Sequence, residues 1–146
     1  MPDGACRIPL VAVRRFGDGL SLGWGAGWDI VAGMKARLDK LVLVRSGDKG
    51  DGSNVGVIAR SPEVYSFLEK ELTSDVVKAH FHAICKGEVE RFEAPNILAL
   101  NFLLHDSLGG GGSASLKTDA QGKTHGLGLS LMELDVPEDV LASLPD

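Results

Sequence analysis

The sequence predicts an α+β fold, a two-layer sandwich with a mainly antiparallel sheet and helices on one face. The first observation is a pair of short apolar runs, residues 41–44 and 55–59, which are typical of buried strands. The second is that amphipathic segments with helical spacing follow them, and the third is an alternating apolar pattern near the C-terminus. Strands that bracket helices, with a terminal hairpin, favour this class.

Helix starts are the clearest local signals after residue 59. Ser61 can cap a helix, Pro62 suits its first turn, and Glu63 is favourable at the positive end of the helix dipole. The stripe that this helix would bury consists of Val64, Phe67, Leu68 and Leu72. A second helix is predicted to start at Thr73, because apolar residues recur at helical spacing through Ile84.

The remaining segments give weaker patterns. Residues 45–54 are rich in Gly and Asp and predict a loop, and residues 89–92 predict a third strand. Residues 96–108 predict a helix capped by Asn96, with a strand in the first half as the alternative. Residues 114–118 and 126–136 predict a hairpin, and residues 137–146 a short amphipathic end.

Charge and glycine divide the chain near residue 40. Residues 1–40 carry six Lys/Arg and four Asp/Glu, whereas residues 41–146 carry nine and sixteen, within a chain of 146 residues and net charge −5. We expect a Gly-rich, poorly ordered extension over 1–40, with a strand at 10–13 and a short helix at 28–40, followed by one domain over 41–146. Alternatively, Trp24 and Trp28 dock on that domain.

Composition excludes several classes of function. The net acidic charge disfavours nucleic-acid binding, and no apolar run reaches the ~18 residues of a membrane span. Two distant cysteines, Cys6 and Cys85, favour a reducing compartment. The cytoplasm is the expected location. The mitochondrial matrix is the alternative, because arginines near the start fit a transit peptide.

Two glycine motifs, residues 47–54 and 109–113, predict the functional site. Glycine lets backbone amides converge on an anion, and Arg45 and Lys49 would add positive charge. Asp48 and Asp51 oppose such a site unless they pair with the cations, and two structural turns are the alternative interpretation. The predicted ligand-binding residues are Arg45, Ser46, Gly47, Asp48, Lys49, Gly50, Asn54, Asn101, Gly109, Gly110, Gly111, Gly112 and Ser113.

Catalytic signals are weaker. Lys49, Asp48 and His105 are acid–base candidates, and His125 is a further histidine near the second glycine motif. No nucleotide-binding or hydrolase motif is present, so we expect no cofactor. His80 and His82 would point about 200° apart on a helix, so we expect no metal site.

Five segments together resemble the C-terminal domain of the AtuA family, which is associated with acyclic terpene utilisation. They are residues 45–51, 54–60, 100–105, 108–113 and 121–123, and the resemblance covers roughly residues 40–137. It implies a ferredoxin-like α+β fold. In full-length members this domain follows a large N-terminal domain, whereas only about 40 residues precede the match here.

The resemblance implies an accessory or ligand-binding domain linked to terpene or acyl-CoA catabolism. We expect it to bind an anionic small molecule or an acyl-CoA, to form homo-oligomers, or to dock on a separate large AtuA-type chain. Two alternatives remain open: a small acyl-CoA-processing enzyme that uses Lys49, Asp48 or His105, and a structural oligomerisation module.

Overall fold

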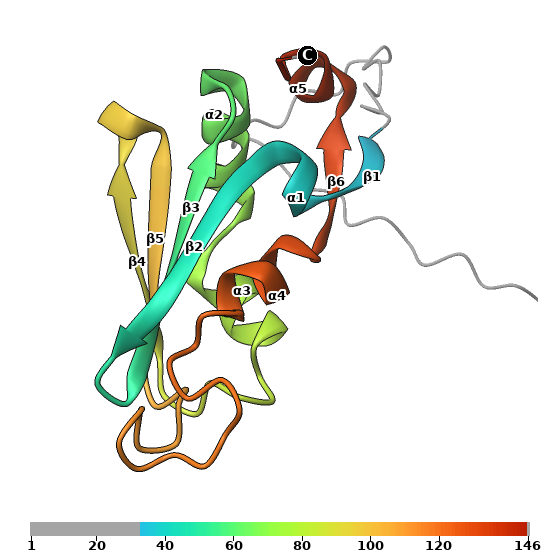
Figure 1. Cartoon of the computed structure of the whole chain (residues 1–146). Coiled ribbons are helices and arrows are strands. Elements are labelled where there is room, and N and C mark those ends of the chain that lie inside the picture. Colours follow the sequence, from blue (N-terminus) through green and yellow to red (C-terminus); the bar gives the residue numbers. More distant parts are fainter. Residues whose placement is uncertain (1–32, 146) are drawn as a thin grey trace, which may run out of the picture. The chain divides into compact units, whose positions relative to one another are not determined.

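A four-stranded antiparallel sheet is the centre of the computed structural model, which describes residues 33–145 (Figure 1). Its strands are β2 (Val42–Lys49), β3 (Gly52–Ala59), β4 (Val89–Ala94) and β5 (Ala99–Leu104), in the order β2-β3-β5-β4. The alternation of β5 is why it is a strand. Leu100, Phe102 and Leu104 are all buried on one side. The predicted helix over residues 96–108 was therefore wrong, and the strand alternative for its first half is confirmed.

Helices cover one face of this sheet. The helices α2 (Pro62–Glu71) and α3 (Ser74–His80) connect β3 to β4, and these two strands run parallel with β5 between them. This is a split βαβ arrangement. Both helices begin where the sequence predicted, because Ser61 and Thr73 accept hydrogen bonds from the amides of Val64 and Val76. The predicted α+β sandwich with helices on one face is confirmed.

The prediction of a loop over residues 45–54 was wrong. β2 continues to Lys49 and pairs with β3 down to Gly52, which leaves a two-residue turn at Gly50 and Asp51. Gly50 has φ +66°, the sign that tight hairpin turns require. Glycine and aspartate suggested a break, but cross-strand hydrogen bonds, which the local sequence does not reveal, hold the segment extended.

A second, two-stranded sheet pairs β1 (Gly33–Arg37) with β6 (Glu133–Pro137). The short helix α1 (Leu38–Leu41) follows β1, and its residues Leu38 and Leu41 are completely buried. The predicted helix at 28–40 is therefore wrong for 33–37, because pairing with a distant strand decided the structure. The predictions on residues 1–32, including the strand at 10–13 and Trp docking, lie outside the described residues.

The predicted terminal hairpin was also wrong. Residues 114–118 form no strand, and α4 (His125–Ser130) precedes β6, while α5 (Glu138–Ala142) ends the chain. Leu127, Leu129 and Leu131 alternate in the sequence, but residues two apart on a helix point about 200° apart. Leu129 is accordingly buried, whereas Leu127 and Leu131 are exposed. Three alternating residues fit one helical turn as well as a strand.

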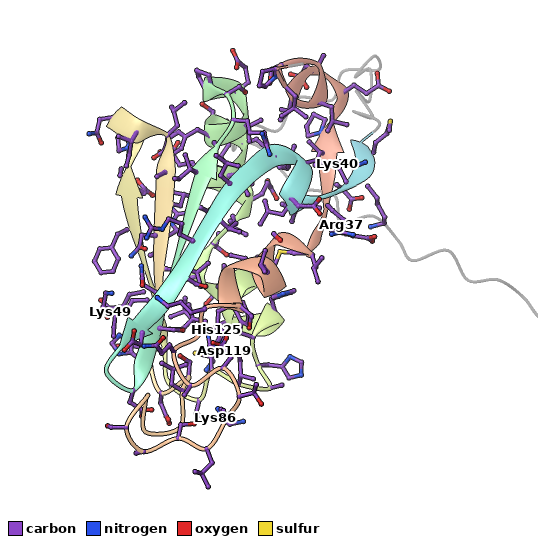
Figure 2. All side chains as sticks on the ribbon, in the orientation of Figure 1. Arg37, Lys40, Lys49, Lys86, Asp119 and His125 are labelled. Atoms are coloured by element: carbon purple, nitrogen blue, oxygen red, sulfur yellow. The ribbon has the colours of Figure 1, made fainter. Side chains whose placement is uncertain are left out.

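A long loop, residues 105–124, connects β5 to α4 and is held in place at its end. The Asp119 carboxylate accepts hydrogen bonds from the Lys123 and Thr124 amides and from the Thr124 hydroxyl. Burial acts to raise the pKa of Asp119, but these hydrogen bonds hold it below its ordinary value. Figure 2 shows Asp119 close to His125, the first residue of α4. The loop end is thus tied to the start of the helix.

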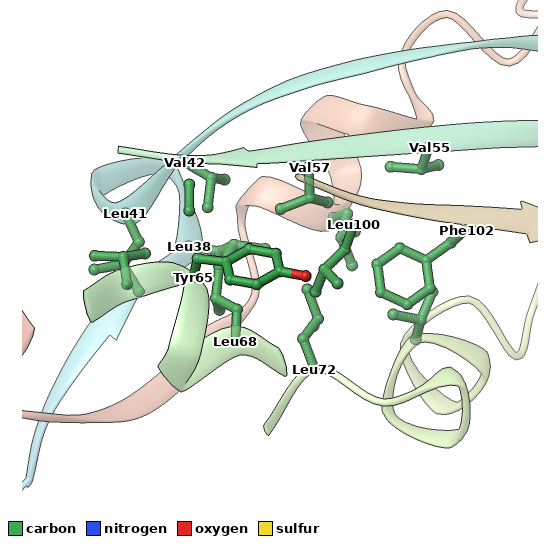
Figure 3. Packing of buried hydrophobic residues seen from close by; sticks show 14 of the residues in the cluster. Leu38, Leu41, Val42, Val55, Val57, Tyr65, Leu68, Leu72, Leu100 and Phe102 are labelled. Atoms are coloured by element: carbon green, nitrogen blue, oxygen red, sulfur yellow. The ribbon is translucent and has the colours of Figure 1, made fainter. Parts of the chain in front are cut away.

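Apolar side chains from the sheet, α1 and α2 form the core (Figure 3). Val57 and Leu100 come from the sheet, Leu68 and Leu72 from α2 and its end, and all four are at most 1% exposed. Within residues 33–145, no helix has the length and apolar character that crossing a membrane requires.

The side chain of Tyr65 places a hydroxyl group in this core. The Tyr65 hydroxyl is buried and has no hydrogen-bond partner among the described residues. A buried hydroxyl without a partner costs about 1–3 kcal/mol. We therefore expect Tyr65→Phe to raise the free energy of unfolding by about 1 kcal/mol in urea titrations. A lower stability in the variant would show that the hydroxyl has a bonding partner.

Candidate functional site

The candidate site is a groove on the outer face of the four-stranded sheet, opposite the helices. It encloses about 440 Å³. Its polar lining residues are Arg45, Ser46, Gly47, Asp48, Lys49, Asn54, Asn101 and Lys123, and its apolar ones include Ile58, Ala94, Ile97, Ala99 and Leu100. Seven predicted ligand-binding residues, all except Gly50 and those of the second glycine motif, therefore line one cavity.

Small residues form the hollow. Gly56 lies in the middle of β3, paired with Arg45 on one side and Asn101 on the other. A Cβ atom at Gly56 would meet its nearest neighbours only at 3.8 and 3.9 Å, which is ordinary contact. The missing side chain is therefore not forced by crowding. Its absence, together with Gly47 and Ala99, leaves the sheet face open to a ligand.

The polar end of the groove lies toward the β2–β3 turn. Arg45 and Lys49 are exposed on β2, and the Lys123 ammonium lies 3.1 Å from the position that a Cβ atom of Gly47 would take. Figure 2 shows Lys49 near the turn end of its strand. Three cations against the single carboxylate of Asp48 make this end locally positive, although the chain as a whole carries a charge of −5.

Two asparagines give the groove directional hydrogen bonds. The Asn54 Nδ2 donates to Asn101 Oδ1 over 3.2 Å, across neighbouring strands. Asn101 Oδ1 lies 3.9 Å from the position that a Cβ atom of Gly56 would take, and the amide nitrogen of Asn101 can only donate. A donor among cations is suited to a carboxylate or phosphate oxygen.

Ser46 holds Lys123 at the groove. Its hydroxyl donates to the Lys123 carbonyl over 2.9 Å and accepts from the Gly126 amide over 2.9 Å. The Ser46 side chain points toward α4, on the side of the sheet opposite the outer face. From there its hydrogen bonds hold the backbone of Lys123 and Gly126 in place. Lys123 is 77 positions away in the sequence, and only folding brings it to this place.

A buried hydrogen-bond chain anchors the same region. Ser107 donates to the Leu104 carbonyl, so its oxygen accepts from Ser53, whose oxygen in turn accepts from Nδ1 of His125. Burial lowers the pKa of His125, and the carboxylate of Asp119 partly opposes this effect. This chain ties the start of α4 to β3 and keeps Lys123 in place.

The second glycine motif lies outside the groove. The Gly110 amide donates to the carboxylate of Asp51, and the Ser107 and Leu108 amides donate to the Asp51 carbonyl. The motif thus packs on the β2–β3 turn, and an amide predicted to bind an external anion binds a carboxylate of the chain itself. Gly109, Gly112 and Ser113 belong to the same loop and do not line the groove.

His105 does not meet the other acid–base candidates. Its Nε2 atom pairs with the Glu90 carboxylate, and Glu88 lies beside them, with ligand atoms of the three residues within 4.8 Å of one another. Lys49 instead donates to the carbonyl of Asp48 over 3.0 Å in the groove. The three predicted catalytic residues therefore divide between two places.

Sequence reasoning missed Gly56 and Lys123 as site residues. A lone glycine within the apolar run at 55–59 was the available signal, since glycine inside a strand often marks a close approach or a cleft. Lys123 lies within a segment that carries the family resemblance, but its position in the sequence gives no sign that it reaches β2.

The fold and the groove define a small α+β domain with an open, partly cationic sheet face. The family model of the AtuA ferredoxin-like domain matches residues 36–137, from β1 to the end of β6. The chain belongs to this family, which confirms the resemblance. No curated protein and no solved structure matches the chain.

Proposed function

We propose that the domain binds a small amphipathic anion, a carboxylate attached to a short apolar chain, in the groove on the outer sheet face. The observation that carries this proposal is the division of the groove into two ends. Arg45, Lys123 and Asn101 provide charge and a donor toward the turn end, whereas Ile58, Ala94 and Ile97 make the other end apolar. The two ends suit the two halves of such a ligand.

The volume limits the ligand. About 440 Å³ is at the lower end of the range for small-molecule sites, roughly 300–1,000 Å³. A short acyl chain with its head group fits this space, and a complete acyl-CoA does not. The association of the family with acyclic terpene utilisation makes short branched acyl groups the relevant class. If the ligand is a thioester, its nucleotide part extends from the groove past Lys49 into solvent.

Binding is the role that the groove supports best, because no histidine is among its described lining residues, and the Lys49 ammonium there donates to the carbonyl of Asp48. The domain would then retain or present an acyl compound for a reaction that other residues perform. A separate large AtuA-type chain remains the predicted partner for this step.

Isothermal titration with octanoate, octan-1-ol and acetate tests the proposal. We expect octanoate to bind, and the alcohol and acetate to bind at least about tenfold more weakly, because each lacks one half of the interaction. A further titration with octanoyl-CoA shows whether the domain binds a thioester or the free acid more tightly. Equal binding of octanoate and octan-1-ol would contradict the proposal.

Neutralising Arg45 is expected to weaken octanoate binding. A charge-assisted hydrogen bond contributes about 1.5–3 kcal/mol, so Arg45→Gln should raise the dissociation constant about tenfold or more. Lys70→Gln on α2 is the matched control, since it removes one exposed cation from the helical layer. Unchanged binding in Arg45→Gln, or an equal loss in Lys70→Gln, would place the ligand elsewhere.

A further inference from the structure

The outer sheet face carries more apolar surface than a small ligand covers. Leu43, Ile58 and Phe92 point away from the helices and are 57%, 37% and 50% exposed, and Ile97 beside them is 60% exposed. Scattered exposed apolar residues are normal, but three on one sheet face, with Ile97 at its end, suggest an interaction surface. We propose that a second copy of this chain covers this face, in competition with the ligand.

Strand pairing arranges the outer face in rows that cross the sheet from β2 to β4. The first row is Leu43, Ile58, Ala99 and Ala94. The second row is Arg45, Gly56, Asn101 and Phe92. The third row, nearer the β2–β3 turn, is Gly47, Asn54, Leu103 and Glu90. In the first row, large residues lie on the β2 side and small residues on the β4 side.

A twofold axis parallel to the strands, between β3 and β5, makes these rows self-complementary. It places β2 over β4 of the second copy and β3 over β5, as in aligned sheet packing. Leu43 then faces Ala94 of the second copy, and Ile58 faces Ala99. Large side chains meet small ones, so the two faces can approach closely.

Charge complementarity also favours the twofold axis parallel to the strands. The second row brings Arg45 onto the Phe92 ring of the second copy, a cation–π arrangement. The third row brings Lys123, whose ammonium lies over Gly47, toward Glu90, whose carboxylate also pairs with His105 of its own copy. The other in-plane axis, perpendicular to the strands, would place β2 antiparallel on β2 of the second copy, so that the cations Arg45 and Lys49 would face the same cationic strand. Like charges disfavour that alternative.

The size of the face predicts a weak dimer. Four strands about 4.8 Å apart and about six paired residues per strand give roughly 400 Å² of projected area per copy. Stable interfaces bury about 800 Å² of accessible surface per partner, so we expect this dimer to form only at high protein concentration. The second copy would place Glu90 against the cationic end of the groove, where the ligand head group binds. Ligand and second copy therefore exclude each other.

Sedimentation velocity over micromolar to submillimolar protein tests the dimer. We expect the dimer fraction to rise with concentration. Glu90→Lys and Lys123→Glu should each weaken association about tenfold or more, and the double variant should restore it. Glu71→Lys on α2 is the control, because it makes the same charge change on the helical layer. A monomer at every concentration, or a double variant no better than the singles, would overturn the proposal.

The competition rests on the proposed function and has its own test. Glu90 lies outside the groove, so the monomeric Glu90→Lys variant should still bind octanoate. Octanoate should dissociate the wild-type dimer. A dimer that persists with octanoate bound would overturn the competition. If neither the wild type nor Glu90→Lys binds octanoate, the proposed function fails. The sedimentation of the double variant, Glu90→Lys with Lys123→Glu, still tests whether the dimer forms as proposed.

Discussion

Gly111→Ala is expected to destabilise the domain more than any other exchange of a single glycine in the 109–113 motif. Gly111 has φ +76°, and a Cβ atom there would lie 2.5 Å from the Gly50 carbonyl oxygen. The left-handed conformation alone costs roughly 1–2 kcal/mol for a residue with a side chain, and the contact with a backbone atom adds to it. We expect the free energy of unfolding to fall by about 2–4 kcal/mol.

Urea unfolding monitored by circular dichroism measures this effect, with Gly112→Ala as the matched control. Gly112 has no positive φ, and its Cβ atom would meet only Gln121 Cγ, at 3.9 Å. The control should remain within about 0.5 kcal/mol of wild type. Similar losses in the two variants would show that the motif does not pack on the β2–β3 turn as described.

Gly56→Val is expected to weaken ligand binding strongly while leaving the fold intact. The valine side chain would occupy the middle of the groove, and its Cβ atom would make only ordinary contacts. Valine also favours the strand conformation, so the free energy of unfolding should rise by about 0.5–1 kcal/mol. Octanoate affinity should fall about a hundredfold, because a filled groove excludes the chain of the ligand.

Two variants accompany this measurement by titration calorimetry. Gly56→Ala fills less of the groove and should give an intermediate affinity. Gly33→Val places the same substitution in a strand of the other sheet, where a Cβ atom has neighbours at 3.5–3.6 Å, and it should not change binding. Full affinity in a folded Gly56→Val protein would exclude this groove as the site.

The contrast between these two glycines explains why the glycine excess of the sequence was a useful but incomplete guide. Gly111 is required by the backbone and by a close neighbour, whereas Gly56 is compatible with larger residues and keeps a cavity open. Composition counts both equally. The sequence drew attention to the clustered glycines, and the isolated Gly56 within an apolar strand went unnoticed.

Local interactions made part of the fold predictable. The starts of α2 and α3 depend on side chains three residues from the amides that they cap, so the sequence alone located them. Leu100, Phe102 and Leu104 alternate over a full strand, and that pattern supported the strand alternative. The hairpin at Lys49–Gly52 and the helix at His125 were mispredicted, because contacts with other elements decided both.

By itself, the sequence determined the class of fold, the family and two helix starts. It also predicted as site residues 45–49, Asn54 and Asn101, which line one groove in the structure. Those features follow from capping, periodicity and motifs read within a few residues. Only the tertiary structure decided that Lys123 joins Arg45, that the Gly110 amide binds Asp51, and that Gly56 lies at the middle of a groove. The physical reason is that cross-strand register and loop packing join residues far apart in the chain, and no local pattern records those distances.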